Sequence, residues 1–174
     1  MILIVEGVNN TGKSTLINFL ESSLGYHSIN DDTNKEYSHD KHAFGIHSKA
    51  VLLAYTNILM KCPDSFNVIF DRFHLSEFVY GMIERGYYSS WVFDIDDQLF
   101  KMGAKLLYME DDLESVNERA GRDLKMHQEL FETVYNQSML DKMRYNLKNP
   151  VSEVLGWIQD EKQQQHRSSV SLIE

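Results

Sequence analysis

The chain has 174 residues, 43% hydrophobic and 25% charged, which is typical of one soluble globular domain. Its net charge of −9 disfavours the phosphate backbone of DNA as a partner. Cys62 is the single cysteine, which excludes an internal disulfide and a multi-cysteine zinc site, and we expect it to be a buried small hydrophobe. No apolar run has the length of a membrane span and no signal-peptide pattern occurs, so we expect no membrane contact and a cytoplasmic location, or the host cytoplasm if the source is viral.

Short apolar runs alternate with helical patterns along the whole chain. The runs predict strands at Ile2–Glu6, Tyr26–Ile29, Asn67–Asp71, Lys105–Met109 and, more weakly, Arg144–Leu147. Apolar positions at helical spacing predict helices at about 13–24, 45–61, 75–85, 90–102, 113–119, 127–141 and 151–162. This alternation indicates a single α/β domain over residues 1–174 with a parallel sheet. We expect the polar residues 30–44 to form a mobile surface segment and residues 163–174 a flexible tail.

A phosphate-binding motif lies between the first predicted strand and the first predicted helix. Gly7–Ser14 reads G-V-N-N-T-G-K-S, a full match to G-x-x-x-x-G-K-[ST]. The glycines let the backbone turn tightly and point N–H groups at phosphate oxygens, and the helix that follows adds the positive end of its dipole. We therefore expect ATP and Mg²⁺ as ligands, with the nucleotide held by Gly7, Asn9, Asn10, Thr11, Gly12, Lys13, Ser14 and Thr15.

The strand predicted at Asn67–Asp71 ends in a carboxylate. In P-loop folds this strand lies beside the strand that precedes the loop, which would bring Asp71 close to Ser14. A hydroxyl and a carboxylate are oxygen ligands of the kind that Mg²⁺ prefers. We therefore predict Ser14 and Asp71 as the metal-binding pair.

The residues from Asp71 to Gly86 resemble a known family. They read D-R-x-x-x-S-x-x-x-Y-x-x-x-x-R-G, similar to the corresponding stretch of bacterial thymidylate kinases. Glu6-Gly7 matches both thymidylate and deoxynucleoside kinases, and later landmarks occur in the same order at Lys105–Met109, Asp112–Val116, Phe131–Tyr135 and Asn149–Val154. The resemblance implies a three-layer P-loop fold with a five-stranded parallel sheet of order 2-3-1-4-5, a lid at about 111–127 and a homodimer.

The resemblance also implies roles for individual residues. Arg72 would bind the phosphate of the acceptor, since a guanidinium fork suits an oxyanion. Lys13 would hold the donor phosphates with the loop backbone, while Arg119 and Arg122 would close over the transferring phosphoryl group and neutralise its charge, although both arginines could also be ordinary surface residues of a helix. The residues expected to bind the acceptor are Asn9, Phe44, Arg72, Ser76, Tyr80 and Arg85.

Two departures from the family fall on the acceptor side. Asn9 stands where thymidylate kinases usually carry an aspartate, and the stretch Leu53–Asn57 lacks the arginine of their A-x-R motif. The phosphate-donor motif is intact. We therefore expect phosphoryl transfer to be retained while the identity of the acceptor stays open.

The leading hypothesis is transfer of the ATP γ-phosphate to a deoxynucleoside monophosphate, dTMP or a modified pyrimidine nucleotide. One alternative is a deoxynucleoside kinase that uses Glu6 as general base on a 5′-hydroxyl, although the E-R-S motif of those enzymes reads Asp71-Arg72-Phe73 here. Others are a kinase of 5-hydroxymethylpyrimidine, free or within DNA, and a nucleotide-binding module without catalysis. A GTPase switch is excluded because neither D-x-x-G nor N-K-x-D occurs.

Overall fold

The protein is described by a computed structural model, which covers residues 1–30, 40–62 and 67–159. Its centre is a five-stranded parallel sheet of order β2-β3-β1-β4-β5, which confirms the predicted topology. The strands are β1 (Ile2–Glu6), β2 (His27–Ile29), β3 (Val68–Asp71), β4 (Lys105–Met109) and β5 (Asp141–Tyr145).

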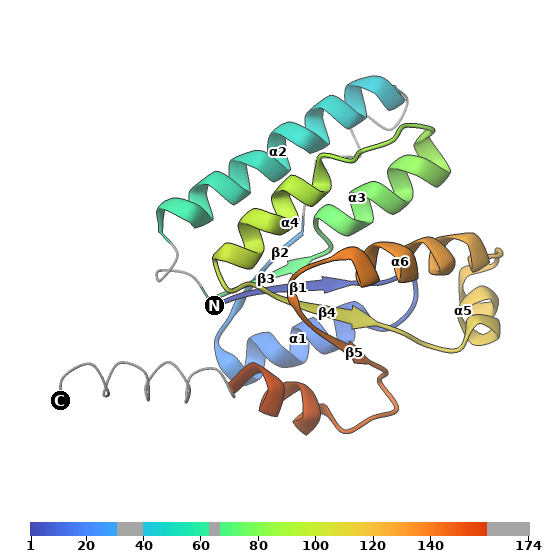
Figure 1. The fold of residues 1–174 in the computed structure, drawn as a ribbon. Helices are drawn as coiled ribbons and strands as arrows, with labels where there is room; N and C mark the ends of the chain where they lie inside the picture. The colour runs from blue at the N-terminus through green and yellow to red at the C-terminus, as the bar shows by residue number, and fades with distance from the viewer. Residues whose placement is uncertain (31–39, 63–66, 160–174) are drawn as a thin grey trace.

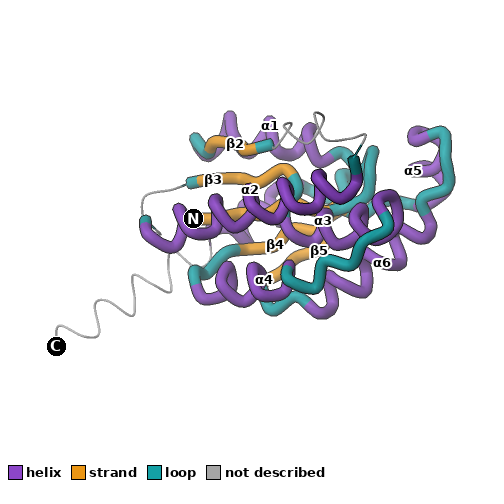
Figure 2. The backbone as a smooth tube through the Cα atoms, turned by 90° about the horizontal axis from the view of Figure 1, so that it is seen from above, coloured by secondary structure: helices purple, strands orange, loops and turns teal. Residues whose placement is uncertain are grey.

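Helices cover both faces of this sheet, which confirms the expected three-layer α/β architecture (Figure 1). They are α1 (Lys13–Leu24), α2 (Lys41–Lys61), α3 (His74–Tyr80), the π-helix η3 (Gly81–Arg85), α4 (Val92–Lys101), α5 (Leu113–Ala120), α6 (Lys125–Gln137) and a helix over residues 151–159. Helices α2, α3, α4 and α6 lie on one face, while α1 and the 151–159 helix lie on the other. Figure 2, viewed from above, shows α5 set apart at one end of the sheet.

The central strands feed two hydrophobic cores because successive side chains of a strand point to opposite faces. Ile4 and Leu106 pack toward α2, α3, α4 and α6. Val5 and Leu107 pack toward α1 and the 151–159 helix. Strands buried on both faces form near-continuous apolar runs, which is why the β1 and β4 runs were visible in the sequence.

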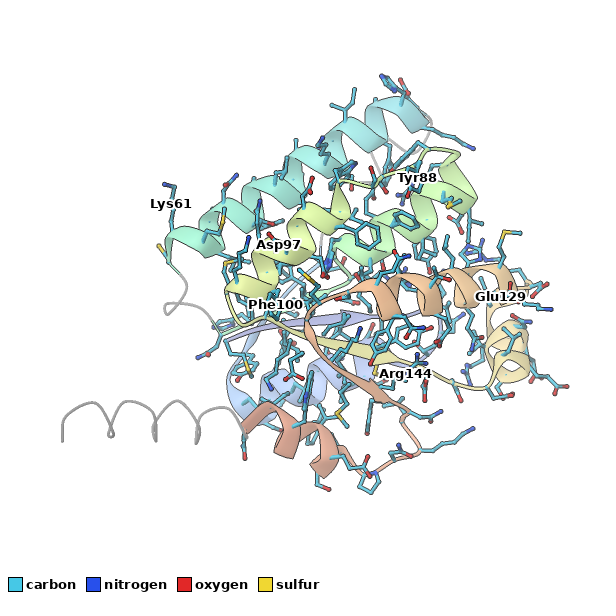
Figure 3. The ribbon with its side chains drawn as sticks, in the orientation of Figure 1. Lys61, Tyr88, Asp97, Phe100, Glu129 and Arg144 are labelled. Carbon is cyan, nitrogen blue, oxygen red and sulfur yellow. The ribbon has the colours of Figure 1, made fainter. Side chains whose placement is uncertain are left out.

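The fifth strand is Asp141–Tyr145 rather than the predicted Arg144–Leu147, and α6 ends at Gln137 rather than at 141. The edge strand is polar, so its residues do not form an apolar run. Charge pairs hold it in place: Lys105 Nζ lies 2.7 Å from the Asp141 carboxylate, and both terminal nitrogens of Arg144 donate to the carboxylate of Glu132 on α6. Figure 3 shows Arg144 beneath α6.

Two further expectations are corrected. Cys62 is exposed, because it is the residue after the last turn of α2 and not part of its buried face. Helix α2 begins at Lys41, within the segment expected to be mobile, because the Asp40 side chain accepts hydrogen bonds from the first free N–H groups of the helix. Residues 31–39 of that segment and the expected tail at 163–174 lie outside the described residues. Within the described part of the chain, no helix is both long and apolar enough to span a bilayer.

Candidate functional site

The loop after β1 has a backbone conformation that its glycines make possible. Gly7 has a φ of 139° and Gly12 a φ of 86°, both in the range that residues with a Cβ rarely adopt. A Cβ on Gly7 would lie 2.4 Å from the carbonyl oxygen of Met109, so the loop packs against the end of β4 with no room for a side chain. The motif thus forms a compact turn directly ahead of α1.

Lys13 is buried inside this loop. Its Nζ donates to the carbonyl oxygens of Gly7, at 3.0 Å, and Val8, at 2.5 Å. Burial, with the nearby positive charge of Arg72 as a second cause, lowers the pKa of Lys13 to about 7. A phosphate group at the loop would replace the carbonyl partners and supply the negative charge that favours protonated lysine.

A pocket of about 290 Å³ lies against the loop. It is lined by Asn9, Asn10, Gly12, Lys13, Ser14, Thr15, Asp71 and Arg72. Two of the expected nucleotide-binding residues, Gly7 and Thr11, do not line this pocket: the Gly7 carbonyl accepts from Lys13, and the buried Thr11 hydroxyl donates to the Val8 carbonyl at 3.1 Å.

The residues predicted to bind a metal lie on the same pocket. Strand pairing sets Val5 opposite Asp71, which places the end of β3 beside the start of the loop. The Ser14 hydroxyl and the Asp71 carboxylate both line the pocket and are oxygen donors suited to Mg²⁺. Among the described residues no cluster of three or more His, Cys, Asp or Glu could form a protein-only metal cage. Mg²⁺, which is usually bound by one or two carboxylates plus substrate phosphates, fits such a site.

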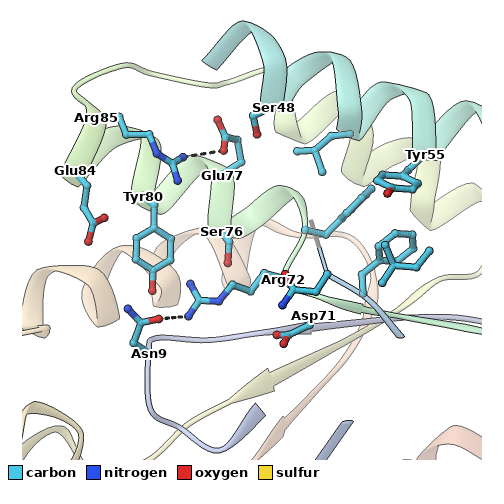
Figure 4. Close-up of a pocket in the computed structure, with 15 residues that line it drawn as sticks. Asn9, Ser48, Tyr55, Asp71, Arg72, Ser76, Glu77, Tyr80, Glu84 and Arg85 are labelled. Atoms are coloured by element: carbon cyan, nitrogen blue, oxygen red, sulfur yellow. Dashed lines mark hydrogen bonds and ion pairs between the residues drawn. The ribbon is translucent and has the colours of Figure 1, made fainter. Parts of the chain in front are cut away.

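Arg72 lies at the junction of two pockets in a strained backbone conformation. Its φ of 70° is unusual for a residue with a side chain, and such strain concentrates at functional sites. Its guanidinium donates to the Asn9 side-chain oxygen and lies over the Tyr80 ring, 4.9 Å from the centroid (Figure 4). Contacts from the loop and from α3 therefore fix the direction of this side chain.

A second cavity, of about 300 Å³, extends from Arg72 between α2 and α3. It shares Asn9, Asp71 and Arg72 with the loop pocket, so the two spaces meet along one wall. Of the residues expected to bind the acceptor, it is lined by Asn9, Arg72, Ser76, Tyr80 and Arg85. The remaining one, Phe44, does not line this cavity but lies under Arg85, whose guanidinium carbon is 3.7 Å from the ring centroid.

The far end of the cavity carries a buried carboxylate that the sequence analysis did not identify. Glu77 is 5% exposed and accepts hydrogen bonds from Arg85, at 2.9 Å, and from the Tyr87 hydroxyl. Burial raises the pKa of Glu77, although the bonds from Tyr87 and Arg85 oppose that shift. The Tyr87 ring fits at this position because Gly81 has no side chain: a Cβ on Gly81 would lie only 2.8 Å from the ring.

Glu6 holds the start of α3, and does not occupy the position of the general base that the nucleoside-kinase alternative assigned to it. Its carboxylate is fully buried and accepts hydrogen bonds from the backbone N–H groups of Phe73, Leu75 and Ser76 and from the Ser76 hydroxyl. These donors are the free N–H groups at the start of α3, so Glu6 anchors that helix to β1. It lines neither of the two pockets.

The two arginines of the expected lid bind different sides of the site. Arg119 donates to the Asn10 carbonyl at 3.1 Å and forms an ion pair of 2.6 Å with Asp111. Arg122 forms an ion pair of 2.8 Å with Glu84. Both side chains are 46% exposed and line neither pocket. Arg119 thus contacts the phosphate-binding loop, and Arg122 contacts a residue of the second cavity.

Among the cavity residues that the sequence analysis did not identify are Ser48, Glu77 and Glu84. Two of them carried a signal, since Glu77, Tyr80 and Glu84 are spaced three and four apart and would share one face of the predicted 75–85 helix. The sequence around Ser48 gave no such signal, because the position of Ser48 depends on how α2 packs. His74, which lies within the Asp71–Gly86 motif, lines neither pocket, and its Nε2 lies 2.8 Å from the Asp96 carboxylate on α4.

Comparison with known proteins identifies the fold. No family model matches the chain, and no curated protein matches it significantly. The YorR protein from Bacillus subtilis, solved in complex with phosphorylated GDP, is similar in structure, with a TM-score of 0.69, 22% identity, and coverage of 96% of this chain and 98% of that one. Deoxyadenosine kinase from M. mycoides with products dCMP and a flexible dCDP bound has a TM-score of 0.56 at 16% identity, covering 94% and 100%. These similarities show a P-loop kinase fold.

Proposed function

We propose that the protein transfers the γ-phosphate of ATP to a deoxynucleoside monophosphate, most simply a pyrimidine nucleotide such as dTMP or a modified relative. The observation that carries this proposal is the shared wall between the two pockets. Asn9, Asp71 and Arg72 border both the loop pocket and the second cavity, so phosphates bound on either side would meet there. Phosphoryl transfer depends mainly on such positioning and on neutralisation of charge.

The donor side would bind ATP through the loop backbone and Lys13. Ser14 and Asp71 would hold Mg²⁺, which neutralises charge on the β- and γ-phosphates when it is bound. Arg72 would bind the acceptor phosphate with the part of its fork that does not contact Asn9. Arg119 and Arg122, already held beside the two pockets, would approach the transferring group.

A phosphorylated acceptor is favoured over a nucleoside for two reasons. Arg72 offers a cationic fork at the shared wall, where an acceptor phosphate would lie. The carboxylate proposed as general base for a 5′-hydroxyl, Glu6, is buried and occupied by the start of α3. A nucleoside kinase would need a base from elsewhere.

The size and polarity of the cavity favour one class of nucleobase on the acceptor. A volume of about 300 Å³ is at the small end of ligand pockets, which favours a single ring. The far end offers an acceptor, Glu77, next to a donor, Arg85. A pyrimidine edge carries a ring or amino N–H beside a carbonyl or ring nitrogen, and could satisfy both groups.

The test is an ADP-release assay with purified protein, ATP and Mg²⁺. The acceptors are dTMP, dCMP, 5-hydroxymethyl-dUMP, dAMP, dGMP, thymidine and a single-stranded oligonucleotide containing 5-hydroxymethyluracil, with products identified by mass spectrometry. We expect turnover with one or more pyrimidine monophosphates and its loss in Lys13→Ala. Turnover confined to nucleosides or to the oligonucleotide, or tight ATP binding without any transfer, would refute the proposal. Sedimentation of the same sample tests the homodimer that the family resemblance implies.

A further inference from the structure

Helix α3 continues into a π-helical turn that directs two neighbouring side chains into the second cavity. In η3, the N–H groups of both Gly86 and Tyr87 reach back to the Gly81 carbonyl. Glu84 and Arg85 both line the cavity, with Arg85 turned toward Glu77 and Glu84 lying beside Tyr80 (Figure 4). Single π-helical turns occur frequently at functional sites. Arg85 pairs with Glu77, which lines the cavity, whereas the partners of Glu84 do not line it.

Glu84 joins three elements that are far apart in the sequence. Its Oε1 accepts a hydrogen bond of 2.8 Å from Arg122, which follows α5, and lies 3.1 Å from His127 Nε2 on α6. Burial alone would raise the pKa of Glu84, but these two partners lower it. Glu84 therefore stays charged at neutral pH and links the expected lid to the cavity wall.

A continuous set of contacts connects this carboxylate with Arg72. Arg72 lies over the Tyr80 ring, and the Tyr80 ring centroid is 5.3 Å from that of His127. His127 is 5% exposed, so its position is set by packing against α3. The Glu84 carboxylate is thus held at a defined place on the same side of the cavity as the residue proposed to bind the acceptor phosphate.

We infer that Glu84 is a positioning residue that holds Arg122 at the acceptor cavity, so that Arg122 serves the acceptor phosphate while Arg119 serves the ATP phosphates. The inference rests on the proposed function, because it takes the ligand of this cavity to be a nucleotide. Arg119 is tied to the other side through Asn10 and Asp111. A guanidinium has five N–H donors, so the bond from Arg122 Nη2 to Glu84 is compatible with further bonds to phosphate oxygens.

Steady-state kinetics with the preferred acceptor test this division of roles. Glu84→Gln and Arg122→Gln should each raise the acceptor KM roughly tenfold, the loss expected for one hydrogen bond to a charged group, with the ATP KM changed by less than about twofold. The double variant should be no worse than Arg122→Gln alone, because Glu84 acts only through Arg122. Arg119→Gln should show the opposite pattern. Glu132→Gln, which disrupts a carboxylate–arginine pair outside both pockets, is the matched control.

A readout without catalysis separates this inference from the proposed function. In the protein alone, Glu84→Gln should speed backbone hydrogen exchange in residues 113–124, while Glu132→Gln should leave that segment unchanged. Faster exchange without phosphoryl transfer in any variant would refute the proposed function and support the positioning contact. Normal transfer with unchanged acceptor KM and unchanged exchange in Glu84→Gln would refute the inference. Arg122 is 46% exposed, so Arg122→Gln tests the same contact if Glu84→Gln fails to fold.

Discussion

The protonation state of Lys13 leads to a measurable prediction about ATP binding. Burial within the loop, with Arg72 as a second cause, lowers the pKa of Lys13 to about 7. At pH 8 only about one lysine in ten would then carry its proton. The negative charge of the ATP phosphates favours the ammonium form, so its pKa rises on binding and each site takes up about 0.9 proton. Above pH 7, ATP affinity should fall by up to about tenfold per pH unit.

Isothermal titration calorimetry at pH 8 measures this uptake directly. The binding enthalpy of Mg–ATP is compared in HEPES and in Tris, whose ionisation enthalpies differ, and the slope gives the number of protons bound. Lys13→Arg is the matched control, because arginine stays charged and takes up no proton. A slope near zero for the wild-type protein, or equal slopes for both proteins, would show that Lys13 does not take up a proton when ATP binds.

Three further predictions concern neighbouring features. Arg72→Lys should lower kcat/KM for the acceptor by about a hundredfold or more while the Kd for ATP measured by calorimetry stays within about twofold, because lysine cannot form the bidentate fork. Gly7→Ala should lower the Tm and abolish ATP-dependent thermal stabilisation, because the new Cβ would meet the Met109 carbonyl. Asp96→Asn should lower the free energy of unfolding, measured by urea denaturation, by about 3 kcal/mol, because it disrupts the buried pair with His74. Burial alone would raise the pKa of Asp96, but hydrogen bonds, chiefly from His74, lower it. The stabilisation that ionised Asp96 gives to the folded protein should therefore be present at neutral pH and lost as the pH falls below about 4.

The loop pocket was predictable because the sequence features that define it are local. The loop motif, the strand before it and the helix after it are contiguous, and a parallel sheet places the end of the neighbouring strand beside the loop. The helix over 13–24 was therefore predicted with the bounds that the structure shows. The strand order followed from the family resemblance, which the apolar runs supported.

The second cavity was less predictable because it depends on packing between distant segments. Arg85 lies over Phe44 across two elements, and Glu77 meets Tyr87 only because Gly45 and Gly81 leave room for that ring. The matching motif placed Glu6 before the loop but could not show that the start of α3 occupies its carboxylate. Motif position alone was thus insufficient to distinguish an anchoring carboxylate from a catalytic one.

The charges at the shared wall explain how two anionic ligands could be brought together in an acidic protein. Lys13 and Arg72 repel one another, and the carboxylates of Asp71 and Glu6 partly offset that repulsion. Glu6 is committed to α3, and Asn9, the group that contacts the Arg72 guanidinium, is a neutral amide where thymidylate kinases usually carry an aspartate. A neutral partner orients Arg72 without neutralising it, so its full positive charge is available to a phosphate dianion. Under the proposed function, the departure at Asn9 would favour an acceptor held mainly through its phosphate, and discrimination between acceptors would take place at the opposite end of the cavity, where Glu77 and Arg85 lie.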